Sequence, residues 1–161
     1  MSINVTDFRK YVVMPALATL EQYAAIPVTK TAADLLMATA AIESGLGLEL
    51  VQEAGGPALG VFMIEPPSLH DLLNLLKPSH KAALAILSTQ ESPDVQVITN
   101  LKYAAAICRL FYWRDPNVLP PDTVSGLWAY YKRIWNTNLG AATFQSFQGA
   151  IKVAGLTGLP M

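Results

Sequence analysis

A single carboxylate stands at the end of an apolar run, and it is the side chain in this sequence best suited to chemistry. Glu43 closes the run 32–43 and is followed at once by Ser44. If the run is a helix, Glu43 shares a partly buried face with Leu36 and Ala40. Burial raises the pKa of a carboxyl group, and the negative end of the helix dipole acts in the same direction. A carboxylic acid that keeps its proton near neutral pH can donate it to the leaving oxygen of a glycosidic bond.

The segment after this acid is rich in glycine and is the least helical part of the chain. Within residues 48–65, the stretch "GVFMIE" at 60–65 predicts a short strand between tight turns. The alternative interpretation of the whole region is an ordinary helix end, with Glu43 solvated and a loop after it. No second catalytic carboxylate is singled out by its spacing, because the candidates are equally typical of solvated loop acids: Glu49, Glu53 and Glu65.

Proline and glycine divide the chain into segments of mostly helical period. This pattern predicts about seven helices and one short, irregular, β-like segment near residues 58–65, a mainly α or α+β fold. The length favours a single domain, residues 1–161. Pro15 is expected to kink or split the first helix. The expected helix starts are Thr6, Thr31, Ser68, Ser79, Ser92, Asp122 and Thr143.

The composition excludes several classes of function. Apolar residues make up 52% of the chain and charged residues 14%, which predicts a compact helical core with apolar surface left for partners. The net charge is −1 with no basic stripe, so no nucleic-acid partner is expected. The lone Cys108 permits neither an intramolecular disulfide nor a cysteine zinc site, and we expect no metal and no cofactor. No run is long enough to span a membrane, and residues 11–20 do not resemble a signal peptide.

Five stretches follow one another in a characteristic order and together cover most of the chain. They are "FRKYVVMPAL", "ATAAIESGLG", "GGPALGVFMIEPPSLHDL", "NLKYAAAICRLFYWR" and "YYKRIWNTNLGAAT". In this order and spacing they resemble the lytic transglycosylase and goose-type lysozyme group, and within it small phage proteins with a transglycosylase-like domain. The resemblance implies a lysozyme-like α+β fold that needs no cofactor.

The resemblance also implies roles for individual residues. Glu43 matches the catalytic acid and base of the group, and Ser44 matches a serine that orients the substrate or the acid. An aromatic run of Trp128, Tyr130, Tyr131 and Trp135 matches the region where the group places aromatic residues that contact sugar. For Trp128 and Trp135, packing in the core is expected more strongly than sugar contact. A tyrosine at position 103 is expected to face the acid. The residues assigned to substrate binding, beside Ser44, are Gly60, Val61, Phe62, Met63, Tyr103, Tyr130 and Tyr131.

One departure from the group leaves two functions open. The group has glutamine where this chain has Met63, and a thioether cannot replace the hydrogen bonds of an amide. The first function is a peptidoglycan-cleaving lytic transglycosylase or muramidase that cuts the β-1,4 bond between N-acetylmuramic acid and N-acetylglucosamine with Glu43. The second is a catalytically degenerate, lysozyme-fold structural or interaction protein of a phage virion.

Partners and location follow from the same resemblance. The expected partners are the glycan strands of peptidoglycan and other phage virion proteins. Without a signal peptide, we expect the protein in the host cytoplasm or in the phage virion, acting in the periplasm or cell wall after delivery.

Overall fold

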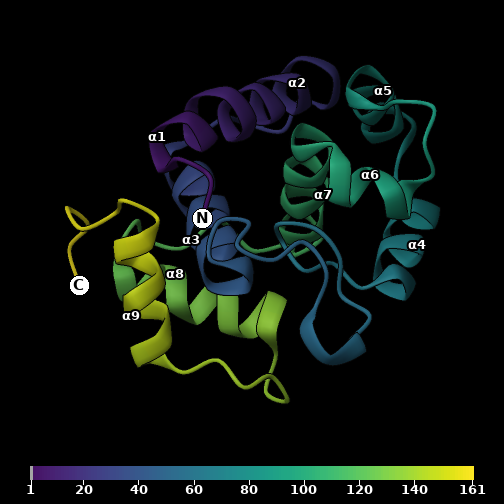
Figure 1. Cartoon of the computed structure of the whole chain (residues 1–161). Helices are drawn as coiled ribbons and strands as arrows, with labels where there is room; N and C mark the ends of the chain where they lie inside the picture. The colour runs from purple at the N-terminus through teal and green to yellow at the C-terminus, as the bar shows by residue number, and fades with distance from the viewer. Residues whose placement is uncertain (1) are drawn as a thin grey trace.

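Two buried helices form the centre of the molecule. In the computed structural model, which describes residues 2–161, these are α3 (Lys30–Ser44) and α7 (Leu101–Trp113) (Figure 1). Helix α3 is buried at every position from Ala32 to Ala41, and α7 is buried at every position from Tyr103 to Leu110. A helix enclosed on all sides is mostly apolar, and the alanine-rich sequences of both helices provide this apart from the buried Asp34, Thr39 and Arg109.

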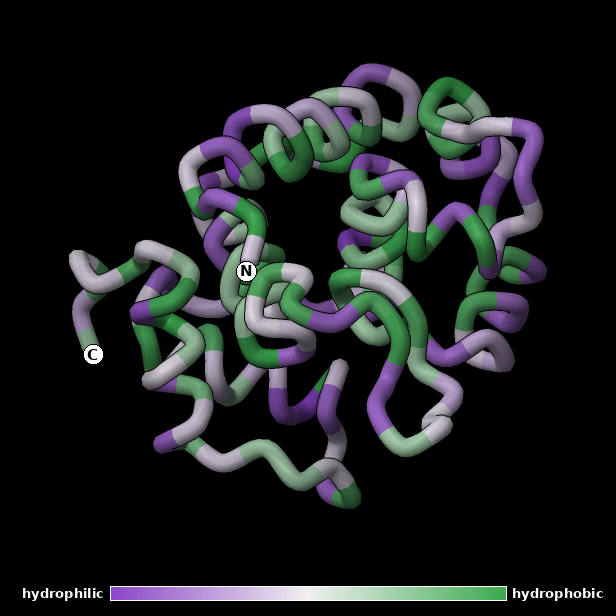
Figure 2. Tube along the Cα trace, viewed as in Figure 1, coloured by the Kyte–Doolittle hydropathy of each residue, from purple (hydrophilic) through white to green (hydrophobic). Residues whose placement is uncertain are grey.

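The other helices surround this pair. Helix α2 packs against α5 and α7, and α9 packs against α3 and α8. Figure 2 shows the hydrophobic residues of these helices turned mostly towards the interior. In chain order the surrounding elements are α1 (Val5–Phe8), η1 (Arg9–Val13), α2 (Met14–Ala24), η2 (Glu53–Gly55), α4 (Pro66–Leu75), α5 (Pro78–Leu87), α6 (Pro93–Thr99), α8 (Val124–Tyr131), η3 (Lys132–Asn136) and α9 (Phe144–Val153).

The predicted mainly helical class is confirmed, but the strand expected at 60–65 does not form. Within residues 2–161, β pairing is confined to two isolated bridges, Val51 with Leu59 and Leu59 with Ile64. Gly60 has a φ of +76° and Met63 a φ of +47°, and the Met63 N–H donates to the Gly60 carbonyl at 3.0 Å. Two left-handed residues so close together close a turn, and an extended strand cannot continue through them.

Two helices depart from their expected course at identifiable residues. A π-helical turn, η1, ends at Val13, two residues before Pro15, and α2 begins at Met14, so the helical residues continue through the proline without a break. The long helix expected after Ser92 is interrupted at Asn100. There the side-chain oxygen accepts the Tyr103 N–H at 3.1 Å, and the side-chain nitrogen donates to the Leu87 carbonyl at 2.7 Å. This one side chain therefore caps α7 and ties it to the end of α5.

Most helix starts lie within three residues of their predicted positions. The expected caps at Ser92 and Thr143 are confirmed, and Thr143 forms a capping box with Ser146. Asn4 and Thr29 cap the helices for which Thr6 and Thr31, two positions further on, were expected, and Thr123 replaces the expected Asp122, one position earlier. Helices α4 and α5 begin at prolines, Pro66 and Pro78, so that Ser68 and Ser79 lie inside the first turns.

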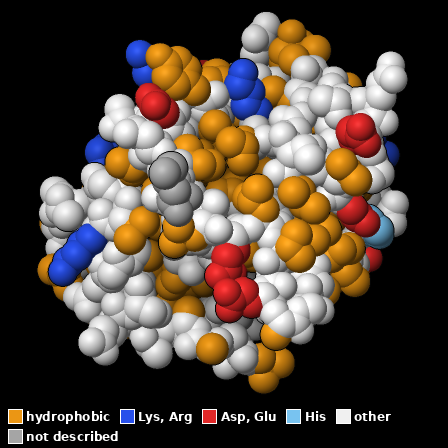
Figure 3. All heavy atoms as spheres, in the orientation of Figure 1, with side chains coloured by type: hydrophobic (Ala, Val, Ile, Leu, Met, Phe, Trp, Pro, Cys, Tyr) orange, Lys and Arg blue, Asp and Glu red, His pale blue; other side chains and the backbone are white. Residues whose placement is uncertain are grey.

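The surface combines apolar and polar side chains with few bases. Figure 3 shows apolar side chains gathered across the centre of one face, with a small group of acids beside them. None of the helices in residues 2–161 has the combination of length and apolar character that a membrane crossing requires.

Candidate active site

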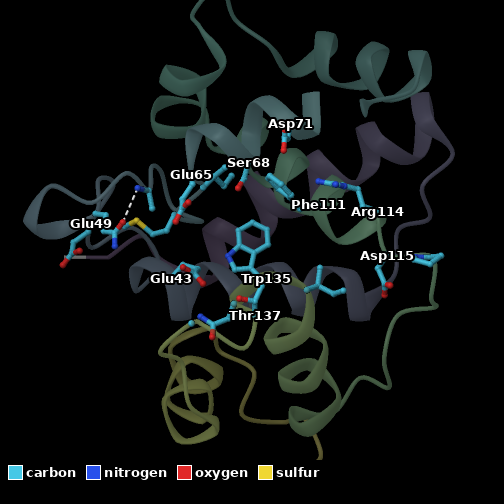
Figure 4. A pocket seen from close by; sticks show the side chains of 18 residues that line it. Glu43, Glu49, Glu65, Ser68, Asp71, Phe111, Arg114, Asp115, Trp135 and Thr137 are labelled. Atoms are coloured by element: carbon cyan, nitrogen blue, oxygen red, sulfur yellow. Dashed lines mark hydrogen bonds between the residues drawn. The ribbon is translucent and has the colours of Figure 1, made fainter. Parts of the chain in front are cut away.

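An open groove with a volume of about 990 Å³ crosses the molecule where five segments meet. Its lining comes from the end of α3, the loop 49–65, the start of α4, the end of α7, and η3 with the turn that follows it. Figure 4 shows Trp135 in the middle of this groove, with Glu43 on one side and Asp115 on the other. The acid that the sequence singles out therefore lies in the wall of the groove.

Glu43 lies in an environment that raises the pKa of its carboxyl group into the neutral range. Burial raises the pKa of Glu43 to about 7, and hydrogen bonding to the side chains of Tyr131 and Trp135 opposes part of this rise. The Tyr131 hydroxyl donates to Glu43 Oε1 at 2.6 Å. One oxygen of the carboxyl group is thus held in place by a buried tyrosine.

The position of Glu43 follows from how α3 ends. Gly45 adopts a left-handed conformation with a φ of +60°, and its N–H donates to the Ala41 carbonyl at 3.0 Å. The next residue, Leu46, donates to the Ala40 carbonyl at 3.2 Å, which completes a glycine-terminated helix end. The helix therefore stops within one turn of Glu43, and the carboxyl group reaches the groove from the last turn.

Ser44 connects the end of α3 to the loop that forms the groove wall. Its hydroxyl donates to the Val61 carbonyl at 2.6 Å and accepts the Gly47 N–H at 2.9 Å, and the side chain is buried. The structure therefore places this residue outside the lining of the groove. It positions the acid by joining the end of α3 to the loop that carries Met63.

The segment expected to line the groove does so only at its last residue. Gly60 packs so closely against α6 that a Cβ atom on it would lie 1.9 Å from the Val97 carbonyl oxygen. Val61 and Phe62 are fully buried, and the Phe62 ring lies 6.3 Å from the Phe8 ring. Met63, by contrast, is part of the groove lining. The first three residues thus anchor the wall in the core, and direct contact with a ligand falls to Met63.

The three tyrosines expected at the site have different positions. Tyr131 is only 1% exposed and acts through its hydroxyl on Glu43. Tyr130 is also buried; its ring stacks on Tyr112, and its hydroxyl donates to the Tyr112 carbonyl at 3.3 Å. Tyr103 is 3% exposed and lies outside the lining of the groove. Its pKa is raised by burial and by the charge of Asp94.

Trp135 lines the groove together with Phe111, although core packing was expected for it from the sequence. Its ring is held edge-on by Phe111 at 5.5 Å and 81°, and lies 5.4 Å from Tyr112. Trp128 does pack inside, against Tyr131, Phe144 and Phe147. The difference arises because residues 132–136 form a π-helical turn, which changes the direction of side chains relative to the period of the preceding α8. The only feature of the sequence that could have indicated a groove residue here is an aromatic run followed by an asparagine-rich turn.

The groove also contains Glu49 and Glu65, two of the acids considered above as a second carboxylate, and charged residues that the sequence did not indicate. Among the described residues its lining includes the acids Glu49, Glu65, Asp71 and Asp115 beside Glu43, and one base, Arg114. Asp115 forms an ion pair with Arg133 at 2.9 Å, which holds the pKa of Asp115 below its usual range. Glu53 beside Glu49 raises the pKa of Glu49. Residues 2–161 contain no group of three or more side chains placed to hold a metal ion.

The arrangement combines three elements of glycan chemistry. A carboxyl group with a pKa of about 7 can act as a proton donor and then as a proton acceptor at neutral pH. The half-buried indole of Trp135, which lines the groove beside it, suits the apolar C–H surface of a sugar ring. The open groove admits a chain that continues beyond the site. Comparison of this chain with models of protein families, with curated proteins and with solved structures finds no match in any of the three sets.

Proposed function

We propose that this protein cleaves the glycan strands of peptidoglycan, as a lytic transglycosylase or muramidase with Glu43 as the single catalytic acid. The observation that carries the proposal is the carboxyl group of Glu43, which has a pKa of about 7, in an open groove beside Trp135. The resemblance of the sequence to the transglycosylase and goose-type lysozyme group supports the same assignment, and with it a lysozyme-like fold and a phage origin.

In the first step, Glu43 donates its proton to the oxygen that links N-acetylmuramic acid to N-acetylglucosamine. The bond from C1 of N-acetylmuramic acid to this oxygen breaks, its electron pair stays with the oxygen, and the N-acetylglucosamine end leaves with a free hydroxyl group. Glu43 is now a carboxylate. The Tyr131 hydroxyl stabilises this charge through its hydrogen bond of 2.6 Å, so that the proton transfer does not leave an unpaired buried anion.

In the second step, the Glu43 carboxylate takes a proton from an attacking hydroxyl group. If the 6-hydroxyl of N-acetylmuramic acid attacks C1, the product is a 1,6-anhydro sugar and no water is consumed. If water attacks, the product is a reducing end. The single-acid route is favoured here because Asp115, the acid on the other side of Trp135, is bound to Arg133 (Figure 4).

Comparison of two proteins tests the proposal that Glu43 catalyses peptidoglycan cleavage. Wild type and the Glu43→Gln variant are incubated with purified peptidoglycan, and loss of turbidity and soluble muropeptides are measured. We expect wild type to release muropeptides and Glu43→Gln to lose at least about a hundredfold in rate, the scale of general acid catalysis. Equal activity of the two proteins would rule out Glu43 as the acid. Anhydro-muropeptides identify a transglycosylase, and reducing ends alone identify a muramidase.

A second candidate function is a non-catalytic virion protein with the same fold. The specific observation that favours it is Met63, which lines the groove where the related group has an amide. On this reading the groove holds a glycan or a neighbouring virion protein without cutting it, and the protein reaches the cell wall within the particle. Binding of peptidoglycan by wild type without muropeptide release would support this candidate.

A further inference from the structure

We propose that Lys132 and Asn136 are positioning residues for Glu43. Lys132 fixes the amide of Asn136 so that an amide N–H group meets the Tyr131 hydroxyl, and this contact directs the hydroxyl proton onto Glu43. The inference rests on the proposed function in taking Glu43 as the catalytic acid. In this role both residues act on Glu43 through Tyr131, and neither touches the reacting atoms.

The π-helical turn η3 brings the three residues together. Tyr131 is the last residue of α8, and Lys132 and Asn136 are the first and last residues of η3. Residues five apart lie on different sides of an α-helix, but a π-helical turn joins residues i and i+5 and brings them to the same side. Asn136 therefore lies over Tyr131, and it lines the same groove as Glu43.

Lys132 determines which way round the Asn136 amide lies. Its Nζ donates to Asn136 Oδ1 at 2.6 Å, and to the carbonyl oxygens of Gly140 at 2.8 Å and Ala142 at 3.2 Å. An ammonium group has three donors and no acceptor, so the amide atom that faces it must be the oxygen. The amide nitrogen of Asn136 is thus turned away from Lys132.

Gly140 holds the amide from a second direction. A Cβ atom on Gly140 would lie 2.3 Å from Asn136 Nδ2 and 2.3 Å from the Asn136 carbonyl oxygen. Only a residue without a side chain permits the backbone to come so close. The amide is therefore held between the Lys132 ammonium group and the Gly140 backbone, in one orientation.

In this orientation the amide nitrogen donates to the Tyr131 hydroxyl. Burial, with the charge and hydrogen bonding of Glu43, raises the pKa of Tyr131, and hydrogen bonding to the Asn136 side chain opposes this rise. A contact that favours the ionised phenol must donate to it, because a phenolate oxygen only accepts. The hydroxyl thus keeps its single hydrogen for Glu43 Oε1, at 2.6 Å. With the amide reversed, Asn136 Oδ1 would compete for that hydrogen.

The charge of Glu43 also acts on two residues of α7. Burial, and to a smaller extent this charge, raise the pKa of the Cys108 thiol and of the Tyr112 phenol, so that both stay neutral at about pH 7. They remain in place when Lys132 or Asn136 is replaced. So do the charged residues that line the groove with Glu43, which are Glu49, Glu65, Asp71, Arg114 and Asp115.

The test is the titration of the Glu43 carboxyl carbon, followed by NMR in the whole chain. Asn136→Leu removes the amide at similar volume. We expect it to raise the proton affinity of Glu43 about two- to fivefold, and less than Tyr131→Phe does, because the hydroxyl remains but loses its fixed direction. Lys132→Met keeps the apolar stem without the ammonium group and should raise the proton affinity in the same direction.

Two matched variants serve as controls. Asn138→Leu replaces an exposed asparagine of the same turn that lies outside the groove lining. Lys152→Met removes the charge of an exposed lysine on α9. Both should leave the Glu43 titration as it is in wild type. A shift in Asn138→Leu as large as that in Asn136→Leu would overturn the inference.

Double variants separate this role from general support of η3. In the Tyr131→Phe background, Asn136→Leu should no longer change the proton affinity of Glu43, because its path runs through the missing hydroxyl. If Asn136→Leu only disordered η3, it would also move Trp135 and would act with or without that hydroxyl. An equal effect in the two backgrounds, or an unchanged titration in Asn136→Leu, would overturn the inference. If Asn136→Leu does not fold, Lys132→Met in the same two backgrounds decides the question.

The outcomes separate this inference from the proposed function, because the titration needs no substrate. If the double variants behave as expected but wild type releases no muropeptides, the proposed function fails and the inference stands. If Glu43-dependent cleavage is found but Asn136→Leu leaves the titration unchanged, the inference alone fails. When both hold, the fall of the cleavage rate at alkaline pH should move to higher pH in Asn136→Leu, because the acid keeps its proton longer.

Discussion

The Tyr131 hydroxyl donates a hydrogen bond of 2.6 Å to Glu43 Oε1, joining α8 to the last turn of α3. The two residues are 88 positions apart in the chain. Because the hydroxyl stabilises the carboxylate form, it limits how far burial can raise the pKa of Glu43. The proton affinity of Glu43 is therefore set by a balance between burial, which raises its pKa, and hydrogen bonding to Tyr131 and Trp135, which lowers it.

Removing the Tyr131 hydroxyl should raise the pKa of Glu43 further. In Tyr131→Phe we expect the pKa of Glu43 to rise above 7, because burial remains and the opposing hydrogen bond is lost. The fold should lose about 1 kcal/mol of unfolding free energy with the hydrogen bond. Titration of the Glu43 carboxyl carbon by NMR measures the change. The control is Tyr130→Phe, whose hydroxyl contacts the Tyr112 carbonyl and should leave the Glu43 titration in place.

Replacing the acid by its amide should stabilise the protein at neutral and alkaline pH. The pKa of Glu43 is raised in the folded state, so between about 4.5 and about 7 the folded protein binds more protons than the unfolded chain, and its stability falls as pH rises. The full difference amounts to about 3 kcal/mol. Urea unfolding at about pH 5 and about pH 8 should show that this loss disappears in Glu43→Gln. A pH dependence that survives in the variant, or that is equally reduced in Glu65→Gln, would contradict the assignment.

Gly60 should tolerate no side chain. In Gly60→Ala the new Cβ would lie 1.9 Å from the Val97 carbonyl oxygen at a φ of +76°, so the loop must move away from α6. We expect a loss of about 2 to 4 kcal/mol in unfolding free energy, measured by chemical denaturation. Gly149→Ala is the matched control, since nothing lies within 4 Å of its new Cβ inside α9, and it should stabilise the protein by up to about 1 kcal/mol.

Restoring an amide at the groove should strengthen cleavage if Met63 is the weak point of the site. The Met63 side chain already lines the groove, so Met63→Gln places a hydrogen-bonding group there without moving the backbone. One such bond is worth about 1 kcal/mol, so we expect about a fivefold rise in the rate of muropeptide release. Met63→Leu has similar bulk without the amide and should leave the rate unchanged. A rate for Met63→Gln no higher than that of Met63→Leu would show that position 63 does not contact the substrate.

The sequence predicted those parts of the site that depend on local order along the chain. The helix end at Gly45, the placement of Glu43 in the last turn and the upward direction of its pKa follow from a short apolar run and its glycines. Trp135 could not be placed, because a π-helical turn leaves no mark in the hydrophobic period. Val61 and Phe62 were expected to line the groove because they match the groove-lining segment of the group that the sequence resembles, and the turn at 60–63 buries both. The acids of α4 and the end of α7 come together only through tertiary packing.

The groove takes its lining from segments spread between Glu43 and Gly140, and no two neighbouring helices contain it. A ligand that touches several of these segments binds only the fully folded chain and gains nothing from partly unfolded forms. Its binding free energy is therefore added to the global unfolding free energy, and not to the stability of one loop. Occupancy of the groove should consequently protect amides in the central helices α3 and α7 from hydrogen exchange, although these helices are far more deeply buried than the groove itself.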